Sequence, residues 1–210
     1  MVKVLECVAT ISSAAAVVNP IFGVAGSLIS VVLHHIDNED LEKLKREFGC
    51  VYRALDEISQ QNQNVLLQIK RETVDGLYAR VEENIRNQFC KFMDTLDPSG
   101  AYEQRREEFE VSYVINQCDQ NLHTLYSGVM GESKVFSQPI LDVYLKYSQG
   151  ERSIMETLCT RLSYLFCIGL MALMGYAAIV GDDEETLQVQ WEAKMKDVAK
   201  KMIDVLNSYE

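Results

Sequence analysis

The sequence has little that would interrupt a helix. Only three of its 210 residues are proline and eleven are glycine, so long stretches contain neither. No stretch of useful length alternates apolar and polar residues as a half-buried strand does, whereas apolar residues recur at helical spacing along most of the chain. The sequence therefore predicts an all-α protein, an elongated helical bundle that forms a single domain over residues 1–210.

The motifs of common enzymes and cofactor sites are also missing. The chain contains no GxGxxG, P-loop, HExxH or GxSxG sequence. His34 and His35 are adjacent, and neighbouring residues on a helix do not share a face, so both cannot easily bind one metal ion. Paired carboxylates such as Glu82-Glu83 and Glu107-Glu108 fall on the polar faces of predicted helices, where we expect them to be solvated. We therefore expect no enzyme, no catalytic residues, no metal site and no cofactor.

Basic residues are too few for a nucleic-acid-binding protein. Asp and Glu number 31 against 20 Lys and Arg, which gives a net charge of −11. Phosphate binding requires a basic surface, so nucleic acid is excluded as a main partner. An anionic membrane would also repel the chain, since no dense basic run is present.

The cysteines do not form a CxxC pair, and their spacings are too wide for a zinc finger. They lie at Cys7, Cys50, Cys90, Cys118, Cys159 and Cys167. All but Cys7 fall within apolar-periodic segments, which favours buried free thiols in a reducing compartment over disulfides. We expect a cytoplasmic protein that can associate with membranes. Secretion is disfavoured because Glu6 lies where a signal peptide would be basic.

Two long runs contain no charged residue, Cys7–Leu33 and Leu162–Gly181. The second has the length of about 20 apolar residues that a helix needs to cross a bilayer. Because it is apolar on every face, it must be surrounded by other helices or by lipid. Three interpretations stay open: a core helix walled by amphipathic helices, a permanent membrane span, and a core helix that enters lipid after a rearrangement. If a membrane is the target, the residues expected to meet lipid are Val17, Ile21, Phe22, Val24, Leu28, Ile29, Val32, Leu165, Phe166, Ile168, Leu170, Met171, Leu173, Met174 and Ile179.

A heptad pattern marks the longest predicted helix, over residues 37–96. Apolar residues from Leu41 to Ile69 alternate at spacings of three and four, with Asn62 as the one polar position, and a looser stripe continues to Leu96. A helix of this length would extend roughly 80 Å. The stripe could face its own chain or a second copy, which leaves a homo-oligomer open.

The remaining segments complete the bundle. We expect an apolar N-terminal helical segment over residues 1–36, two helices over 101–148 (about 101–127 and 136–148), the apolar helix over 151–181 and an amphipathic helix over 183–209. The last helix has the stripe Leu187, Trp191, Met195, Val198, Met202, Val205 and Tyr209.

The order of these elements resembles a known family. An Ala-, Val- and Gly-rich run from Ala14 to Gly26, broken at Asn19-Pro20, leads into the heptad helix, and an apolar helix precedes the amphipathic C-terminus. This order is similar to that of the rapunzel family of bony fishes, which is grouped with cephalotoxin-like proteins. The resemblance implies a non-enzymatic protein tied to fin and skeletal growth or to innate-immune control.

The arrangement also resembles helical pore-forming toxins, in which a bundle shields an apolar segment that later enters a membrane. Our leading hypothesis is a non-enzymatic protein that acts through its apolar helices on membrane lipid. The alternative is a soluble scaffold or signalling regulator that binds a protein partner through its helices.

Overall fold

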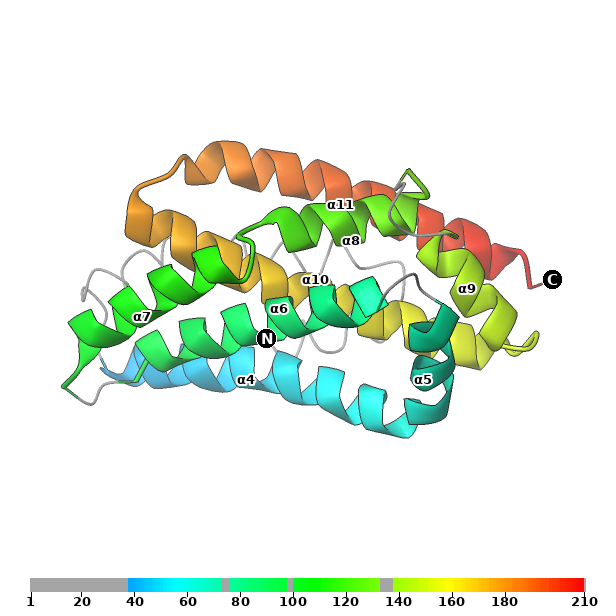
Figure 1. The fold of residues 1–210 in the computed structure, drawn as a ribbon, viewed down its shortest axis with the longest axis horizontal. Coiled ribbons are helices and arrows are strands. Elements are labelled where there is room, and N and C mark those ends of the chain that lie inside the picture. Colours follow the sequence, from blue (N-terminus) through cyan, green and yellow to red (C-terminus); the bar gives the residue numbers. More distant parts are fainter. Residues whose placement is uncertain (1–37, 73–75, 98–99, 133–137, 210) are drawn as a thin grey trace.

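The computed structural model describes residues 38–72, 76–97, 100–132 and 138–209, and every regular element within these ranges is a helix. The helices are α4 (Asn38–Gln61), α5 (Gln63–Glu72), α6 (Leu77–Thr95), α7 (Tyr102–Ile115), α8 (Gln120–Met130), α9 (Ile140–Tyr147), α10 (Arg152–Val180) and α11 (Glu184–Asn207). They form an elongated bundle (Figure 1). The predicted all-α class is confirmed. The predicted N-terminal segment over 1–36, with His34 and His35, lies outside the described residues.

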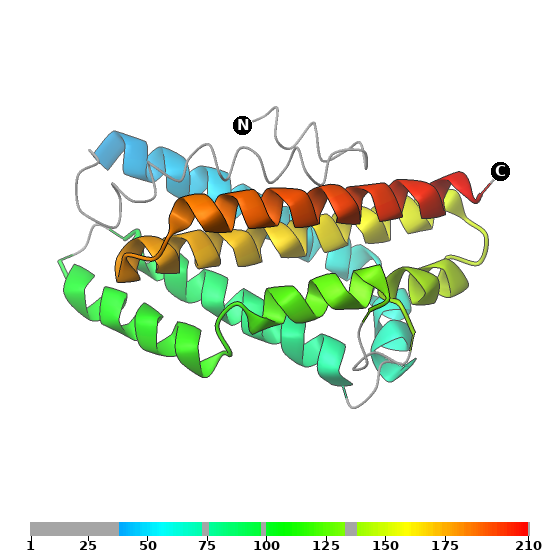
Figure 2. The ribbon, with the colours of Figure 1, turned by 90° about the horizontal axis from the view of Figure 1, so that it is seen from above.

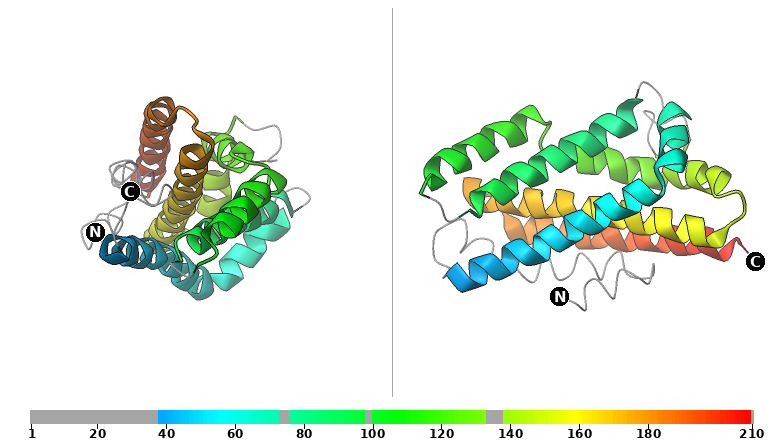
Figure 3. Two further views of the ribbon diagram at one scale, coloured as in Figure 1. Left: turned by 90° about the vertical axis from the view of Figure 1, so that its left-hand side faces the viewer. Right: turned by 90° about the horizontal axis from the view of Figure 1, so that it is seen from below.

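Helix α10 is the centre of the bundle, as the end-on view in Figure 3 shows. It packs against α4, α6, α7, α8, α9 and α11, and each residue from 161 to 175 is buried. Its ends lie within one residue of the predicted range, and Gly181 closes it in the left-handed conformation with φ 72°. The charge-free run over 162–181 is thus a core helix in this structure, which is the first of the three interpretations.

The prediction of one long helix over 37–96 is wrong. The chain turns twice in this range, and α6 returns beside α4 (Figure 1), where Tyr52 stacks on Phe89 at 5.3 Å between ring centroids. At the first turn the Asn62 side chain donates back to the Ile58 carbonyl at 2.9 Å, a local bond of the kind that bends helices. At the second, Gly76 has φ 66°, which glycine adopts without strain.

Folding back lets both halves of the apolar stripe bury against α10. Phe48, Val51 and Leu55 on α4 are at most 2% exposed. Ile85 on α6 is fully buried as well. Most of the described heptad stripe therefore faces the chain's own core, with Ile58 and Val65 partly buried against it.

The single helix predicted over 101–127 is also divided, into α7 and α8, and the helix predicted over 136–148 is the shorter α9. Gln117 and Cys118 separate α7 from α8 with φ values of 69° and 49°. Gln88 on α6 holds this turn, because its side-chain amide lies 2.8 Å from the Cys118 carbonyl oxygen and 3.1 Å from that of Asn116. The partner that fixes the turn comes from another helix, so local sequence does not reveal it.

Two glycines let α10 approach its neighbours closely. A Cβ atom added at Gly175 would lie 2.4 Å from Phe92 Cε2, and one at Gly169 would lie 2.5 Å from Leu122 Cδ2. Both contacts are far shorter than packed carbon atoms tolerate. The apolar run is therefore fitted to α6 and α8 through its glycines as well as its large side chains.

Helix α11 lies along α10 (Figure 2). It falls within the range predicted for the amphipathic C-terminal helix, 183–209, and most of its buried residues belong to the predicted apolar stripe. Trp191, Met195, Val198 and Met202 are fully buried. The Asp183 side chain caps the helix by accepting a hydrogen bond from the Thr186 backbone N–H, at 3.0 Å.

Candidate functional site

The candidate lipid-facing residues of α10 are all inside the bundle. None is more than 7% exposed: Leu165, Phe166, Ile168, Leu170, Met171, Leu173, Met174 and Ile179. The other candidates, Val17, Ile21, Phe22, Val24, Leu28, Ile29 and Val32, lie outside the described residues. In this conformation the α10 set contacts protein, so α10 can reach lipid only if it leaves its neighbours.

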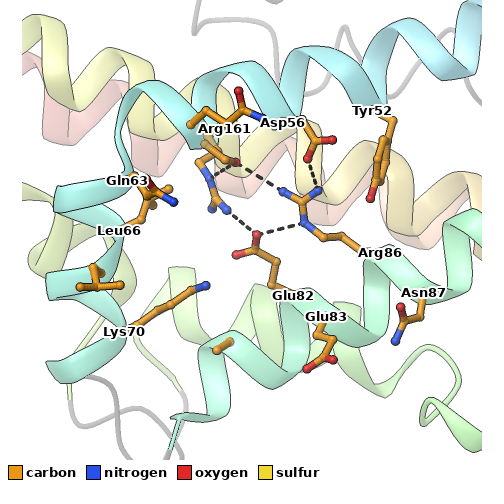
Figure 4. Close-up of a pocket in the computed structure, with 14 residues that line it drawn as sticks. Tyr52, Asp56, Gln63, Leu66, Lys70, Glu82, Glu83, Arg86, Asn87 and Arg161 are labelled. Carbon is orange, nitrogen blue, oxygen red and sulfur yellow. Dashed lines mark hydrogen bonds and ion pairs between the residues drawn. The ribbon is translucent and has the colours of Figure 1, made fainter.

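A buried charge stands at the beginning of the apolar run. Arg161 directly precedes Leu162 and is 1% exposed. Its guanidinium forms an ion pair with Glu82 on α6, and it donates to Ser59 Oγ on α4 at 2.9 Å and to the Tyr78 hydroxyl at 3.2 Å. Figure 4 shows Arg161 and Glu82 pointing toward each other between the helices. The cation that directly precedes the run is thus held by groups from two other helices.

Glu82 is buried at 6% exposure, so its assignment as a solvated carboxylate is wrong. Its Oε1 atom also accepts from Arg86 Nε at 3.1 Å, while Oε2 has no hydrogen-bond partner in the described part of the chain. Glu83, by contrast, is exposed, as are both residues of the Glu107-Glu108 pair. A sequence signal was present: Glu82 lies within the buried stripe of α6, four residues after Tyr78 and three before Ile85.

Arg86 joins the same network from α6. It donates to Asp56 Oδ1 at 2.6 Å, and its guanidinium lies 5.4 Å from the centre of the Tyr52 ring. Burial alone would lower the pKa of Arg86, but its contact with Tyr52 and the charge of Glu82 outweigh this effect, and the pKa is raised. Two guanidinium groups therefore share one buried carboxylate.

The network extends to α9 through two tyrosines. Tyr78 and Tyr144 are fully buried, and their hydroxyl oxygens are 2.8 Å apart. Burial raises the pKa of both phenols, so both stay protonated at neutral pH. Arg161 on α10 is thereby connected to side chains of α4, α6 and α9.

A cleft of about 540 Å³ opens above this network, between α4, α5 and α6. Its charged lining consists of three basic residues, Lys70, Arg86 and Arg161, and three acidic residues, Asp56, Glu82 and Glu83. Side-chain amides, the hydroxyl groups of Tyr52 and Ser59, and the apolar side chains of Leu66, Leu67 and Ala79 form the rest of the wall. This site could not be predicted from local sequence, because its members are scattered over more than 100 residues.

The five described cysteines are free thiols, as predicted. Cys159 and Cys167 on α10 are buried, and burial raises the pKa of Cys159 to about 12. Cys50 and Cys118 are only partly buried and Cys90 is exposed, so the prediction of core thiols holds for α10 and is only partly correct elsewhere. No group of three or more metal-ligating side chains occurs among the described residues.

Comparison with known proteins identifies the family. The family model of the cephalotoxin-like middle helical domain matches residues 35–210, a range that includes the eight helices of the described residues. Protein rapunzel of Danio rerio is 65% identical over 209 residues, which cover 99% of this chain and 92% of that protein. The chain belongs to the rapunzel family. The resemblance drawn from the order of its elements is confirmed. No solved structure gives a significant match.

Proposed function

We propose that this rapunzel-family chain is a non-enzymatic protein that acts on membranes by releasing α10 from the bundle into lipid. One observation supports the proposal above the others. Helix α10 contains an 18-residue window of mean hydropathy 1.9, long and apolar enough for a bilayer, and 89% of that window is buried inside the protein. The bundle would be the stored, cytoplasmic form of a membrane-active helix. Fin and skeletal growth or innate immunity is the setting that we propose for this activity.

The energetics allow such a second state. Lipid tails are about as apolar as the leucine-rich core, so α10 exchanges one apolar environment for another when it enters a bilayer. The free-energy cost arises mainly where the apolar faces of the surrounding helices, such as those with Phe92 and Trp191, lose their contact with α10. Lipid can cover those faces too, which brings the two states closer in free energy.

Arg161 sits where a membrane-bound α10 would need a cation. It lies immediately outside the 162–181 run, so in a span formed by that run it would stand near the lipid headgroups. A long basic side chain at the end of a span can extend to the headgroups, and this lowers the cost of burying its helix. The residue that fixes α10 in the bundle could therefore also anchor it at a bilayer surface.

We expect the detergent-free chain to release dye from liposomes, most strongly from anionic liposomes at about pH 5. Carboxylates begin to take up protons as the pH falls toward their ordinary pKa values, which are about 4. The negative charge of the chain, −11 at neutral pH, then decreases, and so does its repulsion from an anionic surface. The measurement compares neutral and anionic liposomes at about pH 7 and about pH 5.

A variant on the surface of the bundle tests whether dye release depends on α10 or on exposed apolar side chains. Ile115 on α7 is 74% exposed, the highest fraction among the exposed large apolar residues of the described chain. Ile115→Asp should leave dye release unchanged, because α10 and not this face enters lipid. Loss of release in this variant would contradict the proposal. Absence of both release and lipid binding under all conditions would direct the function to a soluble regulator that binds a protein partner.

A further inference from the structure

We propose that the cleft between α4, α5 and α6 binds a small neutral polyhydroxylated molecule, such as a sugar or a cyclic polyol. The inference goes beyond membrane action and does not depend on it. It starts from Glu82, which lines the cleft and whose Oε2 atom is buried and has no hydrogen-bond partner in the described residues. A buried charged acceptor without a partner costs free energy, so a donor arriving at this point would be stabilised.

Hydrogen-bond capacity in the cleft favours groups that both donate and accept. Arg161 donates to Ser59, Tyr78 and Glu82, which uses three of the five N–H groups of its guanidinium. Arg86 also makes three bonds, to Glu82, Asp56 and Ser59. The bonds that the structure shows thus leave N–H donors on both guanidiniums and an acceptor on Glu82. Hydroxyl groups meet both needs, since each can donate one hydrogen bond and accept others.

The charge of the cleft argues against an ionic ligand. Its three basic side chains balance its three acidic ones. An anion seated near the guanidiniums would meet Glu82 Oε2 and Asp56, and a cation beside Oε2 would meet Arg86 and Arg161. A neutral polar ligand avoids both repulsions.

The rest of the lining fits the same ligand class. The side-chain amides of Gln60, Gln63 and Asn87 offer further donors and acceptors, while Leu66 and Leu67 supply an apolar wall for C–H groups. The volume of about 540 Å³ lies within the usual range for small-molecule sites. A bound polyol would contact side chains from α4, α5, α6 and α10 together, and so would stabilise the closed bundle by mass action.

The test is a titration of the full-length, ¹⁵N-labelled chain, followed through the Nε–Hε signals of Arg86 and Arg161. Four probes are used: glucose, myo-inositol, inorganic phosphate and ethylammonium. We expect a saturable shift of both signals with at least one of the neutral polyols, with a midpoint in the millimolar range, and no saturable shift with either ion.

Two tryptophan variants locate the binding. Gln63 is exposed and lines the cleft, so Gln63→Trp should fill it and weaken polyol binding at least tenfold. Gln104 is exposed on α7, away from the cleft, and Gln104→Trp should bind as the unmodified chain does. Thermal melting checks that both variants are folded.

Three results would overturn the proposal. The first is the absence of a saturable shift with either polyol, which would mean that water alone occupies the cleft. The others are tighter binding of phosphate or ethylammonium than of both polyols, and unchanged polyol binding in Gln63→Trp. None of these titrations measures dye release, so a negative result for polyol binding can be distinguished from a negative result for membrane action.

Discussion

Arg161→Met should lower the free energy of unfolding by about 3–5 kcal/mol, because it removes one partner of a buried ion pair. Arg161 and Glu82 are only 1% and 6% exposed, so the carboxylate left behind would be poorly hydrated in the folded protein. Tyr78 and Ser59 lose a donor in the same change. Urea denaturation followed by circular dichroism gives the free energy.

A double-mutant cycle separates the interaction energy of the Arg161–Glu82 pair from the effect of each single substitution. Glu82→Met should be about as harmful as Arg161→Met, since it leaves the buried guanidinium of Arg161 and the partly buried one of Arg86 without their shared carboxylate. The double variant Glu82→Met/Arg161→Met should lose less than the sum of the two single losses, because no unpaired charge facing α10 remains. Strict additivity would contradict the assigned network.

Another arginine on the same helix supplies the control. Arg152 pairs with Glu156, and their side chains are 53% and 45% exposed. Because water screens this pair, Arg152→Met should cost less than about 1 kcal/mol. An equal loss of unfolding free energy in Arg152→Met and Arg161→Met would show that burial does not determine how strongly the Arg161 ion pair stabilises the fold.

Trp191→Ala is expected to have the second large effect, a loss of about 3–5 kcal/mol of stability. Trp191 is fully buried on α11 and packs against His123 of α8 with ring centroids 5.1 Å apart. Its removal loosens the helix that lies along α10, so we also expect faster dye release from anionic liposomes. Denaturation and release rates are measured on the same preparations.

Trp191→Phe is the matched variant. It retains an aromatic ring and removes an indole N–H that has no hydrogen-bond partner among the described residues. The loss of stability should therefore stay below about 1.5 kcal/mol, and release should be close to that of the unmodified chain. Release that is equally fast in the unmodified chain and in Trp191→Ala would show that opening of the bundle does not limit the membrane step.

Helical periodicity predicted the parts of the fold that local sequence determines. The ends of α10 and α11 and the buried stripe of α11 follow from runs of apolar residues and from the acidic turn around Asp183. The reversal of α4 into α6 could not be read in the same way, because a heptad stripe looks alike in one long helix and in two helices that fold onto a common core.

The candidate site was predictable only in part. The apolar run was visible as a charge-free segment, but Arg161 was overlooked because it lies one residue outside it. Glu82 was misassigned because adjacent carboxylates usually mark a solvated face, and its partner stands 79 residues away on α10. Long-range pairs of this kind leave no local periodic signal.

Labelling of Cys167 from within the bilayer tests the central claim most directly. The variant retains Cys167 alone, with the other five cysteines replaced by serine or alanine, and is mixed with anionic liposomes that contain a lipid-soluble maleimide. Cys167 is fully buried on α10. Our account predicts that it stays unlabelled when lipid is absent and becomes labelled at the rate of dye release. Dye release with Cys167 still unlabelled would show that α10 remains in the bundle, and would contradict the account.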